Sequence, residues 1–103
     1  MIRDVRLSGP TLKLLRLLVE SPERGRSGAD ISRATNIGSS TLYPLLQRLE
    51  AAGWLTSVWE EIDPADAGRP RRRFYTLTPE GLRHALRELQ ALQFSPTGAP
   101  AWG

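Results

Sequence analysis

A stripe of leucines at helical spacing constrains the fold of this sequence more than any other feature. Four leucines recur at i, i+3, i+4 and i+7, on one face of an α-helix: Leu42, Leu45, Leu46 and Leu49. Ser39 or Ser40 is expected to cap this helix, and Gly53 supplies the residue that ends it. Pro44 has no N–H and fits only near the beginning of a helix, so it predicts a start near residue 40.

A shorter helix precedes the leucine-striped one. Residues 27–30 (SGAD) predict a capping box with a short carboxylate, and the helix that they open runs to about Thr35. Residues 36–38 (NIG) predict a tight turn, because asparagine and glycine both tolerate a positive φ. Two short helices joined by a tight turn that contains glycine are typical of a helix-turn-helix.

Another helix is expected before this pair, over residues 10–20 and capped by Ser8. Its leucines leave only Lys13 and Arg16 facing water, as in a helix largely buried in a small core. The chain has 103 residues, enough for one domain with a small core, so packing against a second copy is plausible.

A long hairpin is expected after the helix-turn-helix. Residues 54–61 and 73–78 carry aromatic and β-branched residues in alternation, which is typical of strands. The segment between them contains Pro64, Gly68 and Pro70, which favour turns over further strand. Such a hairpin beside a helix-turn-helix makes it a winged helix-turn-helix.

Residues 78–80 (TPE) combine an N-cap, a proline at the first helical position and an acid in the first turn, so a last helix begins there. The predicted fold class is therefore α+β, mostly α: a winged helix-turn-helix with a two-stranded wing and a C-terminal dimerisation helix. We assign residues 1–78 to the DNA-binding domain, 79–93 to the dimerisation helix and 94–103 to a flexible tail.

Composition excludes several classes of function. The chain has no cysteine, which excludes disulfides, cysteine-ligated zinc and a thiol nucleophile, and which suits a reducing cytoplasm. Its apolar runs are only a few residues long, so no membrane span and no membrane partner are expected. The formal net charge of +3 by itself is weak support for a nucleic-acid partner.

The outward face of the leucine-striped helix suits contact with DNA. Its outward and flanking positions are small or polar: Ser40, Thr41, Tyr43, Pro44, Gln47, Arg48 and Ala51. Gln47 is suited to adenine, Arg48 to guanine or a phosphate, and Tyr43 to a phosphate through its hydroxyl. An ordinary amphipathic surface helix would show the same pattern.

The hairpin carries four arginines in five positions, with no acid among them: Arg69, Arg71, Arg72 and Arg73. Guanidinium groups so placed can neutralise a strip of phosphates. The alternative is a solvated turn in which they pair with the acids of the other arm: Glu60, Glu61, Asp63 and Asp66. We expect partial pairing near the base of the hairpin and free arginines at its tip.

Two segments together resemble the PadR-type transcriptional regulators. Residues 41–50 (TLYPLLQRLE), followed by 53–55 (GWL), resemble the recognition helix of that family. Residues 72–81 (RRFYTLTPEG) resemble its second wing strand and the start of the following helix. The resemblance covers about residues 8–93 and implies a winged-helix homodimer that binds palindromic promoter DNA, usually as a repressor. Only one helix follows the wing, as in a short subfamily, and residues 20–28 depart from the family's Gly-Pro-x-His-Gly-Tyr pattern.

These considerations give two sets of candidate residues. Contacts to double-stranded DNA are expected from Ser27, Ser39, Ser40, Thr41, Tyr43, Pro44, Gln47, Arg48, Arg69, Arg71, Arg72 and Arg73. The dimer interface is expected to comprise Leu82, Ala85, Leu86, Leu89 and Leu92. Leu89 and Leu92 are expected to have little to pack on within one chain. The alternative is a last helix that closes only its own domain.

The resemblance to short members of the family also implies a small aromatic effector, bound flat between the subunits. Trp54, Trp59 and Trp102 are the available platforms for such a ligand. Trp54 is expected in the core beside the recognition helix and Trp59 along the hairpin, whereas Trp102 lies in the tail.

No catalytic, metal or cofactor site is expected. The single histidine, His84, is expected on the outward side of the last helix, in a row with Glu80 and Glu88 that favours weak ion pairs over catalysis. One histidine and dispersed carboxylates are too few for a metal site. A DNA-binding repressor, a winged-helix protein–protein module that uses the same polar face, and an enzyme are the three hypotheses, and the residue inventory disfavours the last.

Overall fold

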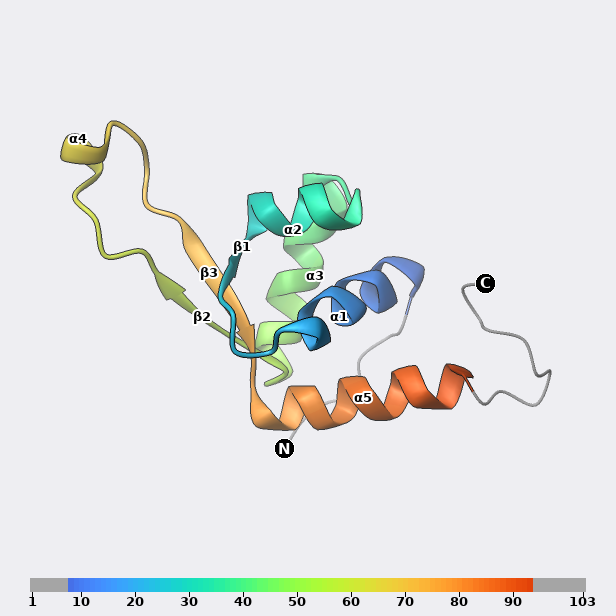
Figure 1. Cartoon of the computed structure of the whole chain (residues 1–103). Coiled ribbons are helices and arrows are strands. Elements are labelled where there is room, and N and C mark those ends of the chain that lie inside the picture. The colour runs from blue at the N-terminus through green and yellow to red at the C-terminus, as the bar shows by residue number, and fades with distance from the viewer. Residues whose placement is uncertain (1–7, 94–103) are drawn as a thin grey trace.

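The computed structural model describes residues 8–93, which form helices and strands in the expected order with two additions (Figure 1). The elements are α1 (Gly9–Glu20), β1 (Arg26–Ser27), α2 (Gly28–Thr35), α3 (Ser39–Ala51), β2 (Leu55–Trp59), α4 (Pro64–Ala67), β3 (Arg73–Leu77) and α5 (Pro79–Gln93). The expected tail at 94–103, with Trp102, lies outside the described residues. None of the helices within 8–93 has the length and apolar character that a membrane span requires.

Local hydrogen bonds explain where α1 and α2 begin. The Ser8 hydroxyl accepts from the Thr11 amide at 3.4 Å, and the Ser27 hydroxyl accepts from the Asp30 amide at 3.1 Å. Both are N-caps of the expected kind. Asn36, with φ of 60°, ends α2 in the left-handed conformation and allows the tight turn into α3.

The start of α3 differs in detail from expectation. Gly38 is its N-cap, and no side chain caps it, so the predicted serine cap is wrong; Ser39 and Ser40 are already helical. Pro44 is the sixth helical residue and cannot donate to the Ser40 carbonyl. Because Ser40 is exposed, water can satisfy that carbonyl, and this explains why the proline is tolerated in the second turn.

The core forms where the leucine stripe of α3 meets α1 and α2. Leu42, Leu46 and Leu49 are fully buried, as the spacing predicts. They belong to one cluster with leucines of α1 and with Ile31 of α2. Helix α1 contacts both α2 and α5, so it joins the helix-turn-helix to the last helix (Figure 1).

The sheet has three antiparallel strands in the order β1-β3-β2, so the predicted two-stranded wing is incomplete. Strands β2 and β3 pair from Leu55↔Leu77 to Trp59↔Arg73, and β1 adds two residues along the other edge of β3. Two residues are too few to show the alternation that predicts a strand, and β1 is recognised as a strand only because it pairs with β3. Strand β1 runs directly into α2, and it therefore fixes the wing to the start of that helix.

A single helical turn, α4, forms the far end of the wing (Figure 1). The Asp63 carboxylate caps it by accepting from the Ala65 amide at 2.9 Å, and Gly68 ends it with φ of 67°. Pro64 at the first helical position suits such a start. The sequence predicted turn alone for this segment.

The beginning of α5 is anchored tightly against the end of α3. The Thr78 hydroxyl donates to the Gly53 carbonyl at 2.7 Å and accepts from the Gly81 amide at 2.9 Å. A Cβ placed on Gly81 would lie 2.1 Å from the Trp54 carbonyl oxygen, so no other residue fits there without movement. Trp54 is buried as expected, but His84 stacks on its ring at 5.2 Å and does not point outward as predicted.

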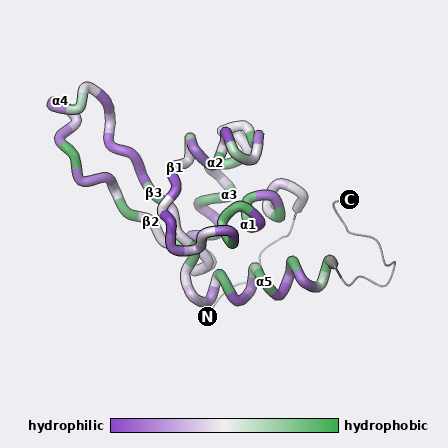
Figure 2. Tube along the Cα trace, viewed as in Figure 1, coloured by the Kyte–Doolittle hydropathy of each residue, from purple (hydrophilic) through white to green (hydrophobic). Residues whose placement is uncertain are grey.

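Helix α5 packs on its own domain more fully than expected. Ala85 is completely buried and Leu89 nearly so, and Leu82 packs against the core. The expectation that Leu89 has little to pack on within the chain is therefore wrong, because Leu89 is already buried in the single chain, in a helix that contacts α1. Leu86 is the exposed large apolar residue of this helix, at 43%. Figure 2 shows hydrophobic and hydrophilic residues alternating along α5.

Candidate nucleic-acid interface

The face of α3 opposite its leucine stripe is open to solvent. The exposed residues are those that the periodicity places there or on the flanks: Ser39, Ser40, Thr41, Tyr43, Pro44, Gln47 and Arg48. Small side chains near the start of the helix allow a partner to approach the backbone closely, and Gln47 and Arg48 supply longer polar groups one turn further along. This face can therefore offer hydrogen bonds to the edges of base pairs.

Arg69, one of the predicted DNA contacts, is paired within the wing. Its two terminal nitrogens donate to the Glu60 carboxylate at 2.7 and 3.0 Å. These bonds hold the pKa of Glu60 below its ordinary value. The prediction of free arginines at the tip is wrong for Arg69, the arginine nearest to α4, because the turn that α4 makes brings it beside Glu60.

Arg73 joins the wing to the recognition helix. Its Nε donates to the Ser57 hydroxyl at 2.8 Å, and a terminal nitrogen lies 3.4 Å from the Glu50 carboxylate of α3. The guanidinium also lies over the Trp59 ring, 5.3 Å from its centroid. With these partners, Arg73 supports the orientation of the wing. Glu50 partly neutralises its charge, so Arg73 attracts an anionic ligand only weakly.

Arg71 and Arg72 are the wing arginines without a carboxylate partner among residues 8–93. The Nε of Arg71 donates to the Ile62 carbonyl at 2.9 Å, which fixes the side chain and leaves its charge uncompensated. The Arg72 side chain makes no hydrogen bond or ion pair within the same range. Arg72 lines a groove together with Ser27, Gly28 and Ala29 at the start of α2. The pKa of Asp30 is lowered, chiefly by its bond from Arg33, with a smaller contribution from Arg72.

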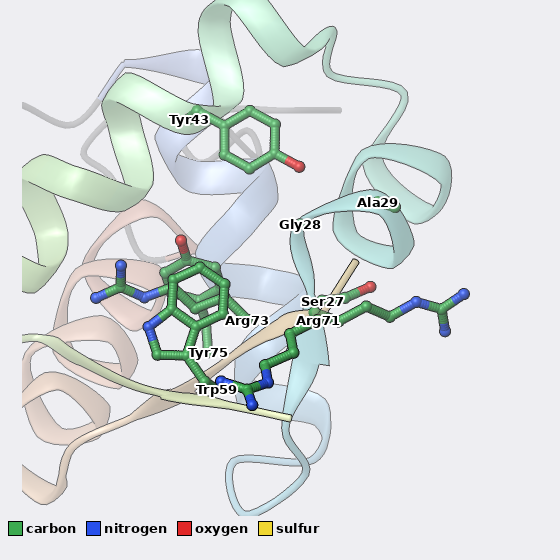
Figure 3. Close-up of a pocket in the computed structure, with 9 residues that line it drawn as sticks. Ser27, Gly28, Ala29, Tyr43, Trp59, Arg71, Arg73 and Tyr75 are labelled. Carbon is green, nitrogen blue, oxygen red and sulfur yellow. The ribbon is translucent and has the colours of Figure 1, made fainter. Parts of the chain in front are cut away.

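A groove of about 370 Å³ lies between the helices and the wing, and we call it the helix–wing groove. It is lined by Ser27, Gly28, Ala29, Tyr43, Trp59, Arg71, Arg72, Arg73 and Tyr75. Figure 3 shows Tyr43 of α3 and the start of α2 on one side of it, with the wing residues facing them. The groove thus brings together donors from three separate parts of the chain.

Some of the groove residues were predicted from the sequence and others were missed. Ser27 is buried, and its hydroxyl serves as a cap, so any contact that it makes to a ligand is through the backbone. Tyr75 and the amides of Gly28 and Ala29 were not predicted. Alternation along β3 places Tyr75 on the buried face with Leu77, and nothing in the sequence indicates that its hydroxyl reaches a groove.

The missing side chain of Gly28 leaves room for the Tyr43 ring against the start of α2. A Cβ at Gly28 would lie 2.6 Å from the Tyr43 hydroxyl oxygen, so that hydroxyl sits directly against the first residue of α2. The outward face of α3 and the N-terminus of α2 therefore form one continuous surface. Over residues 8–93, no group of three or more histidine and acidic side chains is arranged to hold a metal ion.

The sequence matches a family model over residues 14–88, and the family is the transcriptional regulator PadR-like family. This match covers both helices of the helix-turn-helix, the wing and most of α5. The chain belongs to the PadR-like family.

Solved structures agree with the assignment of this PadR-like regulator. The protein smu.1704 from Streptococcus mutans UA159 is 32% identical, with 85% of this chain and 81% of that chain covered and a TM-score of 0.63. A PadR-like transcription factor from Bacteroides fragilis is 28% identical, with 78% and 75% covered and a TM-score of 0.63. A search of curated proteins finds no match.

A third structure is that of BpsR from Bordetella bronchiseptica, whose DNA binding is regulated by 6-hydroxynicotinic acid. It is 26% identical, with 86% of this chain covered and a TM-score of 0.64. The PadR-like chain spans 61% of the length of BpsR, and about the same share of another structure that it matches. These likenesses extend to the winged-helix fold with its three-stranded antiparallel sheet.

Proposed function

We propose that this PadR-like regulator is a cytoplasmic repressor that binds palindromic promoter DNA as a homodimer. Helix α3 enters the major groove and the wing follows the backbone, as in other winged helices. The observation that carries the proposal is the helix–wing groove, where the exposed polar face of α3 adjoins Arg71 and Arg72. Neither guanidinium forms an ion pair with a carboxylate among residues 8–93, so phosphates can compensate these charges.

The test is a gel shift with the DNA upstream of the chain's own gene, repeated at increasing salt. Specific binding that weakens linearly on a log–log plot against salt supports the proposal, because phosphate contacts release counterions. Absence of binding at low salt contradicts it.

Gln47 is expected to contribute base preference. Gln47 is exposed on the outward face of α3, where a carboxamide can bond adenine with two hydrogen bonds. We expect Gln47→Ala to cost roughly 1–3 kcal/mol at one base pair of each half-site and little elsewhere. Binding to a library of operators with single substitutions measures this, and an equal loss on every sequence would contradict direct readout.

The homodimer is supported by the one large apolar side chain that α5 leaves exposed among the described residues, Leu86. Sedimentation of the wild type is expected to show a dimer at micromolar concentration. Leu86→Lys is expected to shift it toward monomer, because the charge replaces apolar area worth roughly 25 cal/mol per Å² when buried. Val58→Lys puts the same charge at an exposed apolar residue of the wing and is the matched control. A monomeric wild type would rule out the dimer.

A small aromatic effector is part of the proposal. BpsR supplies the support, since a hydroxylated aromatic acid regulates its DNA binding. Trp59, exposed on the wing, is the described platform for stacking, whereas Trp54 is already covered by His84.

The second candidate function is a winged-helix module that binds a protein. The acids at the far end of the wing favour it, because Asp63 and Asp66 of the α4 region would repel phosphates. The same gel shift separates the two, since a protein-binding module would show no salt-dependent DNA binding.

A further inference from the structure

A hydroxyl without a partner lies in the floor of the helix–wing groove. Tyr75 is only 7% exposed, yet its hydroxyl makes no hydrogen bond with any residue from 8 to 93. Figure 3 shows the hydroxyl pointing from the sheet toward Tyr43, into the space that the groove residues enclose. Burial raises the pKa of Tyr75, so the group is a neutral O–H donor near pH 7. The side chain is buried as a whole and lines the groove, so its hydroxyl is held in place and can donate to an acceptor atom that enters the groove.

The other polar groups around this space are also donors. The Tyr43 hydroxyl lies against Gly28, and the amides of Gly28 and Ala29 have no acceptor within α2, because they belong to its first turn. Arg72 adds a full positive charge. Two phenols, two amides and a guanidinium suit a single oxyanion with several acceptor oxygens.

The carboxylates near the groove are already bonded to other groups, which reduces their electrostatic repulsion of a bound anion. Glu50 accepts from Ser57 at 2.5 Å and is approached by Arg73, and Asp30 is bonded to Arg33. Arg73 in turn is held by these partners and by the Trp59 ring. The charge that remains at the groove is therefore that of Arg71 and Arg72.

We propose that the helix–wing groove seats one phosphodiester of the DNA backbone, and that Tyr75 donates a hydrogen bond to it. This inference rests on the proposed DNA-binding function and adds a residue that acts from the wing sheet, beneath the recognition helix. It gives each subunit one fixed phosphate position that sets the depth at which α3 enters the major groove.

The first test is Tyr75→Phe, which removes one oxygen and keeps the ring in the core. We expect the affinity for the operator to fall roughly tenfold, because the hydrogen bond is made to a charged group. The melting temperature is expected to be unchanged or higher, because the hydroxyl has no partner in the free protein. Thr76→Val removes another unbonded hydroxyl from β3, next to Tyr75 but on the other face of the strand, and is expected to leave affinity unchanged.

The second test replaces single operator phosphates by uncharged methylphosphonates. We expect one position in each half-site at which the wild type loses affinity and Tyr75→Phe loses much less than the wild type does. At every other phosphate, the losses of binding free energy caused by Tyr75→Phe and by the methylphosphonate should add. Additive losses at all phosphates, or unchanged affinity of Tyr75→Phe, would overturn the inference while leaving the proposed function intact.

A free phosphate compound is distinguished by titrating the wild type with inorganic phosphate and 5′-AMP and following the amide signals of Gly28 and Ala29. We expect weak, millimolar binding for both. Micromolar binding of 5′-AMP that Tyr75→Phe abolishes, with DNA affinity unchanged, would overturn the inference in favour of a nucleotide site. If the wild type binds no duplex at all, the proposed function fails together with this inference. That result is distinguishable from the preceding outcomes, in which the wild type still binds DNA.

Discussion

Gly81→Ala is expected to destabilise the protein by roughly 2–3 kcal/mol, because the added methyl group meets backbone that cannot move aside. The new Cβ would lie 2.1 Å from the Trp54 carbonyl oxygen and 2.7 Å from its carbonyl carbon. To relieve this contact, α5 must shift away from the end of α3 and weaken the bonds that the Thr78 hydroxyl and amide donate to the Gly53 and Trp54 carbonyls. Thermal unfolding should show the melting temperature lowered by roughly 10–20 °C.

Gly9→Ala is the matched control, since Gly9 also lies in the first turn of a helix and nothing lies within 4 Å of the place that its new methyl group would take. Alanine there is expected to be neutral or slightly stabilising, because it restricts the unfolded chain. Equal melting temperatures for the two variants would show that α5 is not fixed to residue 54 as described.

The double variant Arg71→Ala with Arg72→Ala is expected to weaken DNA binding to all sequences by roughly 10–100-fold near physiological salt. Each lost phosphate contact lowers the slope of log affinity against log salt by about 0.9, so the slope should fall by about 1.8. Because neither arginine pairs with a carboxylate in the described chain, their removal should leave the folded state intact. Gel shifts or fluorescence anisotropy at several salt concentrations measure both quantities.

Two comparisons make this prediction specific. Lys13→Ala with Arg87→Ala removes the same net charge from positions outside the groove and should change the salt slope little. Arg69→Ala should have a smaller effect than either groove arginine, because Glu60 already neutralises Arg69. An undiminished slope in the groove variant would argue against a wing that binds phosphates.

The parts of the fold that are encoded locally could be predicted from the sequence. The leucine stripe of α3, the Ser8 and Ser27 caps and the αL residue Asn36 each act within a few positions of the chain, so their patterns are visible in it. The resemblance of residues 41–55 and 72–81 to the PadR-type regulators then supplied the order in which the elements assemble, and the family match agrees with it.

The features that were mispredicted depend on contacts between distant segments. Glu60 and Arg69 are nine positions apart, and only the turn made by α4 brings them together. His84 leaves the outward face because Trp54, thirty positions earlier, offers a ring on which to stack. Leu89 is buried in a helix that contacts α1, an element from the other end of the chain. Helical periodicity assigns a side chain to a face, but it does not say what lies opposite that face.

The contacts among Thr78, Gly81 and Trp54 form a joint that has a consequence for the spacing between the two half-sites of an operator. The joint holds the start of α5 against the turn that follows α3, so in the proposed dimer, joined through α5, it would link the orientation of α3 to that of the interface. The two half-sites bound by a helix-turn-helix dimer lie about 34–36 Å apart, one turn of the DNA helix, or a multiple of that distance. One residue inserted midway along α5 would rotate the interface by about 100° relative to the joint and put the two recognition helices out of phase with the duplex. If the proposed dimer forms through α5, the length of α5 between the joint and the interface would therefore set the operator spacing that the dimer fits.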